Sequence, residues 1–172
     1  PEVCDDADRD SGDGCGATCA PETNWACTTA SPSVCTKRVD LATTTFAFAT
    51  NDVYRGGTAA LDVTVTNSSV HTTNATMVIS APLGLAYKSA TGATCSVDAG
   101  VVTCTFSAAS GATSFVITYD TTVTTASEAS LSVTSLTSSE TDTDLTNHTG
   151  SDTIALLRCG DGIVTAAAET CD

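Results

Sequence analysis

The sequence predicts an all-β protein whose main body is an antiparallel β-sandwich of about seven strands, and three observations predict this class. First, the chain holds 18 Ser and 34 Thr, together 52 of its 172 residues, and only 8 aromatic side chains. Thr and Val suit the pleated surface of short strands and disfavour a helical bundle. Second, apolar residues alternate with period two in several short runs. Third, turn-forming residues separate these runs.

The alternating runs define the expected strands in chain order. They are Phe46 and Phe48; Leu61, Val63 and Val65; Phe115, Ile117 and Tyr119; and Leu131 and Val133. Alternation of this kind predicts strands with one buried face. Turn formers lie between them at 51–52, 56–57, 67–69, 84, 92, 100 and 111. Regular strand spacing with turn signals is typical of an antiparallel sandwich.

The clearest single element is a hairpin over residues 95–104, with the sequence CSVDAGVVTC. A four-residue turn in this segment places Val97 opposite Val102 and Cys95 opposite Cys104. Cysteines that face each other at that register can form a cross-strand disulfide.

Composition divides the chain into three parts, 1–38, 40–157 and 158–172. The two ends carry seven of the nine cysteines and half of the 20 acidic residues. The end cysteines are Cys4, Cys15, Cys19, Cys27, Cys35, Cys159 and Cys171. Nine cysteines with two His and no tight metal-type spacing predict disulfides formed outside a reducing cytosol, in a secreted, extracellular or cell-surface protein. If Cys95 pairs with Cys104, an odd number remains, so at least one is free or paired between units; the connectivity stays open.

The charge balance limits the possible partners. Six basic against 20 acidic side chains give a formal charge of −14, which disfavours nucleic acid or a bare anionic membrane as a partner and favours calcium or another cation. No window approaches the roughly 20 apolar residues of a bilayer helix. The chain begins at Pro1 without a signal stretch, so we expect a processed product or a piece of something longer.

Three motifs of the middle part resemble the Ig-like repeat of bacterial surface proteins, a domain family of unknown function. They are YRGGTAALDVTVTN at 54–67, APLGLAY at 81–87 and AASGA at 108–112, in the family's order. The resemblance covers some 115 residues. It implies an Ig-like sandwich and a stalk or spacer role rather than chemistry.

The two ends, joined back to front, resemble the Myxococcus cysteine-rich repeat. The back end reads CGDGIVTAAAETCD at 159–172, and the front reads PEVCDDADRDSGDGCGATC at 1–19, followed by WAC at 25–27 and PSVC at 32–35. Here the second half of the module comes first and the first half comes last. The pattern Glu-x-Cys-Asp occurs twice, with Cys4 and Cys171 separated by 167 positions. A tandem repeat cut within its module would have this order.

The acidic spacing at the front suggests calcium. Asp6, Asp8, Asp10 and Asp13, with Asp5 beside them, alternate like the oxygen ligands of a calcium loop. The match to an EF-hand is imperfect, since Ser11 replaces the turn Gly and the final Glu is absent. A merely solvated loop is the alternative. The back end is similar to the calcium loop of disintegrin domains, and this likeness implies Asp161, the Ile163 carbonyl, Glu169 and Asp172 as ligands.

These features favour a structural role over catalysis. We expect a repeating unit of an extracellular filament or stalk that assembles head-to-tail with copies of itself, either along one long polypeptide or between separate subunits. Cys159 is the natural cysteine for a link between units. The alternative is an adhesin-type module that binds a glycan or a protein of a host or neighbouring cell. No catalytic constellation stands out, and an enzyme is not expected.

Several weaker signals remain. The sequons at Asn67, Asn74 and Asn147 are candidate glycosylation sites, and the Thr-rich surface is a candidate for O-glycans. His71 and His148 are predicted to be surface histidines. Residues 140–147 are expected to form a solvated acidic loop, and Trp25 is expected to pack against a disulfide.

Overall fold

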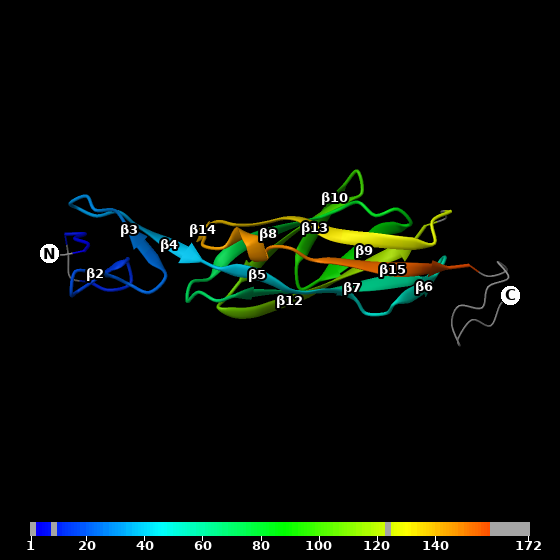
Figure 1. Ribbon diagram of the computed structural model, residues 1–172, viewed down its shortest axis with the longest axis horizontal. Helices are drawn as coiled ribbons and strands as arrows, with labels where there is room; N and C mark the ends of the chain where they lie inside the picture. Colours follow the sequence, from blue (N-terminus) through cyan, green and yellow to red (C-terminus); the bar gives the residue numbers. More distant parts are fainter. Residues whose placement is uncertain (1–2, 8–9, 123–124, 159–172) are drawn as a thin grey trace.

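A computed structural model describes residues 3–7, 10–122 and 125–158. The chain folds into an elongated β-sandwich with a small N-terminal module at one end of its long axis (Figure 1). The predicted all-β sandwich is confirmed. Its two sheets hold ten strands within the described residues, where about seven were expected, because short strands such as the three-residue β6 show little alternation.

One layer is a six-stranded sheet in the order β10-β11-β8-β13-β15-β6. Its strands are β10 (Thr94–Asp98), β11 (Val101–Ala108), β8 (Thr73–Ile79), β13 (Glu128–Ser138), β15 (Ser151–Leu157) and β6 (Asp52–Tyr54). All neighbours pair antiparallel except β15 and β6, which are parallel.

The other layer is a four-stranded antiparallel sheet in the order β5-β7-β12-β9. Its strands are β5 (Leu41–Phe48), β7 (Thr58–Asn67), β12 (Gly111–Thr121) and β9 (Leu85–Thr91). The inward residues of the two layers form one hydrophobic core. The sandwich thus buries one face of each sheet and leaves the other face outward.

The alternating runs of the sequence supply this core with one exception. Leu61, Ile117 and Leu131 are at most 1% exposed, but Val133 is only partly buried. A β-bulge between Val133 and Ser135 shifts the register of β13 against β8. After such a bulge the inward positions move by one, and Leu136 takes the next core position at 3% exposure.

The predicted hairpin is confirmed. β10 pairs with β11 so that Cys95 faces Cys104 and Val97 faces Val102, and the two cysteines form a disulfide. Ala99 and Gly100 both have positive φ, 47° and 84°, which is the conformation of a two-residue type I′ turn.

The N-terminal module consists of short strands and loops. It contains β1 (Cys15–Gly16) paired with β2 (Ala20–Pro21), and β3 (Trp25–Cys27) paired with β4 (Cys35–Val39). On its other side β4 pairs in parallel with β14 (Thr141–Asp142), which precedes the 3₁₀ turn η1 (Leu145–Asn147). No helix in the described ranges is long and apolar enough to cross a membrane.

Candidate functional site: the N-terminal module and its junction

The Ser-Gly-Asp-Gly-Cys segment at 11–15 wraps the carboxylate of Glu22. The Gly12 amide donates to both carboxylate oxygens at 2.9 and 2.8 Å, and the Gly14 amide donates to Oε2 at 3.0 Å. Both glycines have positive φ, 107° and 121°, so their N–H groups turn toward the same point. Backbone amides that converge on one point in this way form a nest for an anion. In this chain the nest holds the protein's own carboxylate.

Gly14 also marks the tightest packing in the module. A Cβ at this position would lie 2.3 Å from the Cys35 Cβ and 2.8 Å from Cε3 of Trp25. The backbone of Gly14 therefore fills the space between Trp25 and the Cys27–Cys35 disulfide. Trp25 was expected to pack against a disulfide; in the structure Gly14 lies between Trp25 and Cys35.

Two disulfides close the module, Cys4–Cys15 and Cys27–Cys35. Disulfides are expected where a small, loop-rich segment has few apolar residues for a core. Cys19 is half-buried and lies outside these pairs, and its carbonyl accepts from the amides of Val3 and Cys4. Cys159 and Cys171 lie outside the described residues.

The module is fixed to the sandwich along one continuous path. β4 ends at Val39, which is fully buried in the sandwich core, and β5 starts two residues later at Leu41. Trp25 packs edge-on against His71, with 5.2 Å between ring centroids, and the Asn24 side-chain oxygen accepts from the amide of Val70 at 3.3 Å. Strand continuity and these side-chain contacts hold the module in one orientation.

A buried polar cluster reinforces the same junction. Asp142 on β14 accepts from the Leu41 amide and pairs with Nε2 of His148, both at 3.1 Å. The side chains of Asp142 and His148 are 4% and 11% exposed. The prediction of a wholly solvated loop at 140–147 is therefore wrong for Asp142. The prediction of a surface histidine is also wrong for His148, because this loop packs back against the start of β5, where Asp142 contacts both Leu41 and His148.

The two histidines have different surroundings. His71 is half-buried against Trp25, and its Nε2 is enclosed without a hydrogen-bond partner in the described residues. It is likewise not the surface histidine that the sequence predicted. Neither imidazole has a Ser or Cys nucleophile among its hydrogen-bond partners in this part of the chain.

Four of the predicted calcium ligands, Asp5, Asp6, Asp10 and Asp13, lie within the described residues. Asp5 uses both oxygens internally, accepting from the Ala7 amide at 3.1 Å and from the Ser31 hydroxyl at 3.3 Å. Oδ2 of Asp6 is enclosed and has no hydrogen-bond partner among the residues that the structure describes, which is a position that a cation would satisfy. Asp10 and Asp13 are exposed. Over the ranges that the structure covers, no three acidic, His or Cys side chains converge as a metal site.

The remaining predicted ligands are not part of the described structure. They are Asp8, Asp161, Ile163, Glu169 and Asp172. The calcium prediction therefore stays a prediction, with Asp6 as the described residue that favours it.

The structure separates the three predicted glycosylation sites. Asn67 is 1% exposed and belongs to the end of β7, so the prediction of a glycan there is wrong for the folded chain. Asn147 is half-buried, and Asn74 is exposed on β8.

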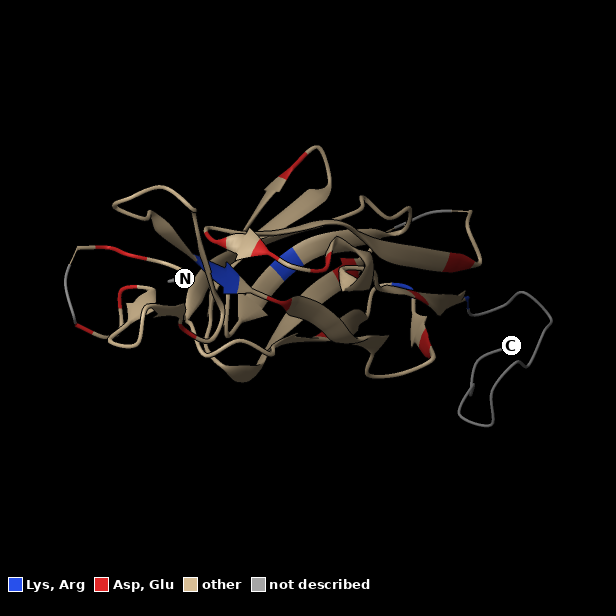
Figure 2. Cartoon of the chain, turned by 60° about the vertical axis from the view of Figure 1, so that its left-hand side comes forward, with Lys and Arg blue, Asp and Glu red and all other residues tan. Residues whose placement is uncertain are grey.

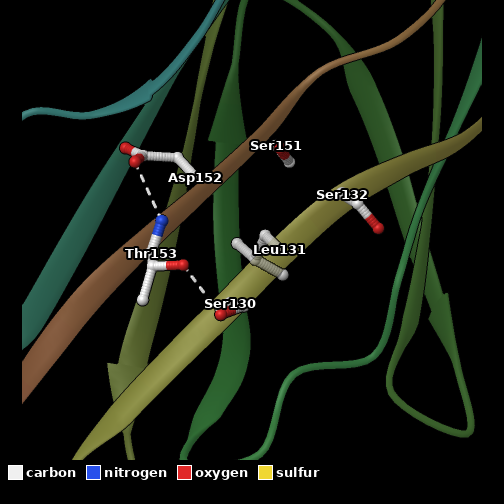
Figure 3. A pocket seen from close by; sticks show the side chains of 6 residues that line it. All are labelled: Ser130, Leu131, Ser132, Ser151, Asp152 and Thr153. Carbon is white, nitrogen blue, oxygen red and sulfur yellow. Dashed lines mark hydrogen bonds between the residues drawn. The ribbon is translucent and has the colours of Figure 1, made fainter.

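Asp and Glu positions are frequent in the loops of the module, while most residues of the sandwich strands are neither acidic nor basic (Figure 2). A hydroxyl-lined hollow lies between β13 and β15 (Figure 3). Its Ser130 and Thr153 hydroxyls are 2.8 Å apart. Its one carboxylate, Asp152, accepts from the amides of Phe48 and Thr153 at 2.7 and 2.8 Å. The oxygens of Asp152 thus connect β15 to β5.

Comparisons with known proteins give no family. No family model matches the chain, and no curated protein matches it. Among solved structures, the chain is similar to a non-cellulosomal cohesin from the hyperthermophilic archaeon Archaeoglobus fulgidus, with 10% identity and a TM-score of 0.48 over 69% of this chain and 91% of the cohesin.

Two further cohesins are similar at the same level. The sixth cohesin of Acetivibrio cellulolyticus scaffoldin B, solved in complex with a Cel5 dockerin mutant, is 12% identical with a TM-score of 0.44, over 66% of this chain and 92% of that one. The seventh ScaB type I cohesin of Pseudobacteroides cellulosolvens is 13% identical with a TM-score of 0.44, over 72% and 96%. At these identities the likeness concerns the β-sandwich fold alone.

Proposed function

We propose that the chain is a structural unit of an extracellular filament or stalk and that units join head-to-tail through their ends. One observation carries this proposal. The N-terminal module lies at one end of the long axis, and the described chain leaves the sandwich after β15, at the opposite end (Figure 1). A unit with its two connection points at opposite ends forms a string when copies are joined.

The junction between the module and the sandwich supports a role in transmitting tension. The module is continuous with the sandwich through β4 and β5, and β14 pairs with β4 at Thr141 and Asp142. Because backbone pairing and buried side chains fix the module, tension applied at one end reaches the other through the sandwich. A flexible linker between two independent domains would not provide this path.

The sequence supplies the complementary ends. Residues 159–172 resemble the first half of a cysteine-rich module, and residues 1–38 resemble its second half. The back end of one unit therefore completes the module at the front of the next. The two surfaces differ, so the contact is heterologous, and such a contact gives an open filament unless the rotation closes a ring.

We propose that calcium and a disulfide hold neighbouring units together at this contact. Calcium binds between the acidic loop at 5–13 of one unit and Asp161, the Ile163 carbonyl, Glu169 and Asp172 of the preceding copy. Asp6 contributes an oxygen that has no hydrogen-bond partner in the described residues. Cys159 forms the inter-unit disulfide. Three disulfides in the described chain are in keeping with an oxidising, extracellular setting.

The test compares the full chain with a chain that ends at Arg158. Light scattering after size exclusion in millimolar calcium should show polymers for the full chain and monomers for the shortened chain. The substitution Asp98→Asn, at the hairpin turn and away from both ends, is the matched control and should still polymerise. A monodisperse monomer of the full chain would refute the assembly and favour the binding-module alternative.

A second measurement separates the two forms of the proposal. The mass of denatured, reduced native material equals one unit if subunits are separate and a multiple of it if they form one polypeptide. A ladder on non-reducing gels that collapses on reduction would support the link through Cys159.

A further inference from the structure

The three sequons of the chain differ in whether the folded protein can carry a sugar on the asparagine nitrogen. N-glycosylation replaces one of the two hydrogens on the side-chain nitrogen with a bulky saccharide. A folded site therefore needs a nitrogen that has a hydrogen to spare and open space in front of it. This requirement divides Asn67, Asn74 and Asn147.

Asn67 fails on both counts. Its nitrogen donates both hydrogens, to the carbonyls of His71 at 2.8 Å and Ala108 at 3.0 Å. Its oxygen accepts from the amide and the hydroxyl of Ser69 at 3.0 and 2.7 Å. With 1% of the residue exposed, a saccharide here would break the connection between β7 and the loop that follows it.

Asn147 is also committed to the fold. Its nitrogen donates to Oδ1 of Asp40 at 3.0 Å, and its oxygen is enclosed. The residue ends η1, beside the His148 and Asp142 pair at the module junction. A saccharide on this nitrogen would lie against the contacts that fix the module.

Asn74 has the opposite surroundings. It is exposed at the second position of β8, between the buried Thr73 and Ala75, so its side chain points outward from the six-stranded sheet. Its backbone carbonyl accepts from the Ser139 amide at 2.9 Å. Within the described ranges its side-chain amide makes no hydrogen bond, and both hydrogens are free.

The sheet surface around Asn74 carries short, uncharged side chains, many of them with hydroxyl groups. Ser107 lies directly opposite on β11. Two residues after Asn74 on β8, at Thr76, a row of four threonines runs across four adjacent strands, with each threonine paired in register with the next. These are Thr94, Thr105, Thr76 and Thr137. Neighbouring strands are about 4.8 Å apart, so the row presents hydroxyl and methyl groups at short, regular intervals beside Asn74.

The outward positions of β8 and β11 carry no charged side chain. They are Asn74, Thr76, Val78, Val101, Thr103, Thr105 and Ser107. In a chain of net charge −14, such a face offers a saccharide hydroxyl partners without long side chains in the way.

We infer that Asn74 carries an N-linked oligosaccharide that lies over this threonine row. The donor is an oligosaccharide linked through its anomeric carbon to a polyprenyl pyrophosphate. The bond from the anomeric carbon to the pyrophosphate oxygen breaks, a bond from that carbon to Nδ2 of Asn74 forms, the amide loses one proton, and the polyprenyl pyrophosphate leaves. No oxidation or reduction takes part. Thr76 supplies the hydroxyl residue that the sequon requires.

Mass spectrometry on the native protein tests the site. Trypsin cleavage after Arg55 and Lys88 gives one peptide, 56–88, that contains both Asn67 and Asn74. Electron-transfer fragmentation should place a hexose or N-acetylhexosamine adduct on Asn74 and leave Asn67 unmodified. An unmodified Asn74, an adduct on Asn67, or adducts confined to Thr hydroxyls would overturn the inference.

Variants made in the same glycosylating host give an independent readout. Asn74→Gln and Thr76→Ala should both lose the whole adduct mass, whereas Thr76→Ser should retain it. Because Asn74 is exposed, Asn74→Gln should leave the melting temperature of the deglycosylated chain unchanged. Retention of the adduct in Asn74→Gln would contradict the assignment even if the Thr76 variants failed to fold.

Discussion

Replacing Gly14 with alanine is expected to unfold the N-terminal module while leaving the sandwich folded. The new Cβ would lie 2.3 Å from the Cys35 Cβ, whereas non-bonded carbon atoms normally approach to about 3.5–4.0 Å. Cys35 is tied to Cys27, and Trp25 is held against His71. Neither neighbour of Gly14 has an easy direction in which to move.

The size of the effect follows from two contributions. Forcing an extra methyl group into a tight site costs about 1–3 kcal/mol, and a non-glycine residue held at a sparsely populated φ costs about 1–3 kcal/mol. Together they predict a loss of about 2–6 kcal/mol for Gly14→Ala. Gly12→Ala is the matched control, since Gly12 has a similar φ of 107° but no atom within 4 Å of the added Cβ. It should show the backbone contribution alone.

The assay uses the single tryptophan of the chain. Trp25 lies in the module, so its emission during urea unfolding reports the module, and far-UV circular dichroism reports the sandwich. Gly14→Ala should shift the Trp25 transition far more than Gly12→Ala, with little change in the sandwich transition. Equal shifts for the two variants would refute the packing argument.

Three further changes have defined outcomes. Glu22→Gln keeps the shape of the side chain but removes the charge held by the Gly12 and Gly14 amides. The free energy of unfolding of the module, measured from Trp25 emission, should fall by about 1 kcal/mol. Tyr119→Phe removes a buried hydroxyl without a described partner and should stabilise the sandwich by about 1 kcal/mol at pH 7. Burial, with a smaller contribution from Tyr87, raises the pKa of Tyr119. The folded chain therefore keeps this proton above pH of about 10, where the unfolded chain releases it, and native stability should fall by about 1.4 kcal/mol per pH unit there. Urea titrations at pH 7 and 11 should show a smaller fall in the free energy of unfolding for Tyr119→Phe than for the unchanged chain, because the variant lacks this ionising hydroxyl. Replacing Cys95 and Cys104 together by alanine should cost about 2.5 kcal/mol in the sandwich transition and leave the Trp25 transition in place.

The sequence predicted those parts of the fold that depend on local pattern. The hairpin at 95–104 follows from its turn residues and the alternation on either side, and the register with Cys95 opposite Cys104 is the one observed. The core positions of β7 and β12 follow from period-two alternation. The bulge between Val133 and Ser135 was not predicted, because it is a change in the pairing register of β13 against β8, and the alternation within one strand does not specify the register of its pairing.

The candidate site was less accessible from the sequence. The Ser-Gly-Asp-Gly-Cys motif was expected from its resemblance to a cysteine-rich repeat, but that resemblance did not indicate that its glycine amides hold Glu22. The partner of this nest lies eight residues beyond Gly14, and only the fold of the module brings it close. The Asp142 and His148 pair depends likewise on long-range contact with Leu41, for which residue spacing gives no signal.

The head-to-tail arrangement of the units is the central claim, and electron microscopy of the native material with and without a calcium chelator tests it most directly. We expect filaments whose axial repeat corresponds to one unit with its long axis along the filament, and we expect chelator combined with reductant to shorten or dissolve them. Dispersed single particles in calcium, or units stacked side by side with their ends free, would contradict the account.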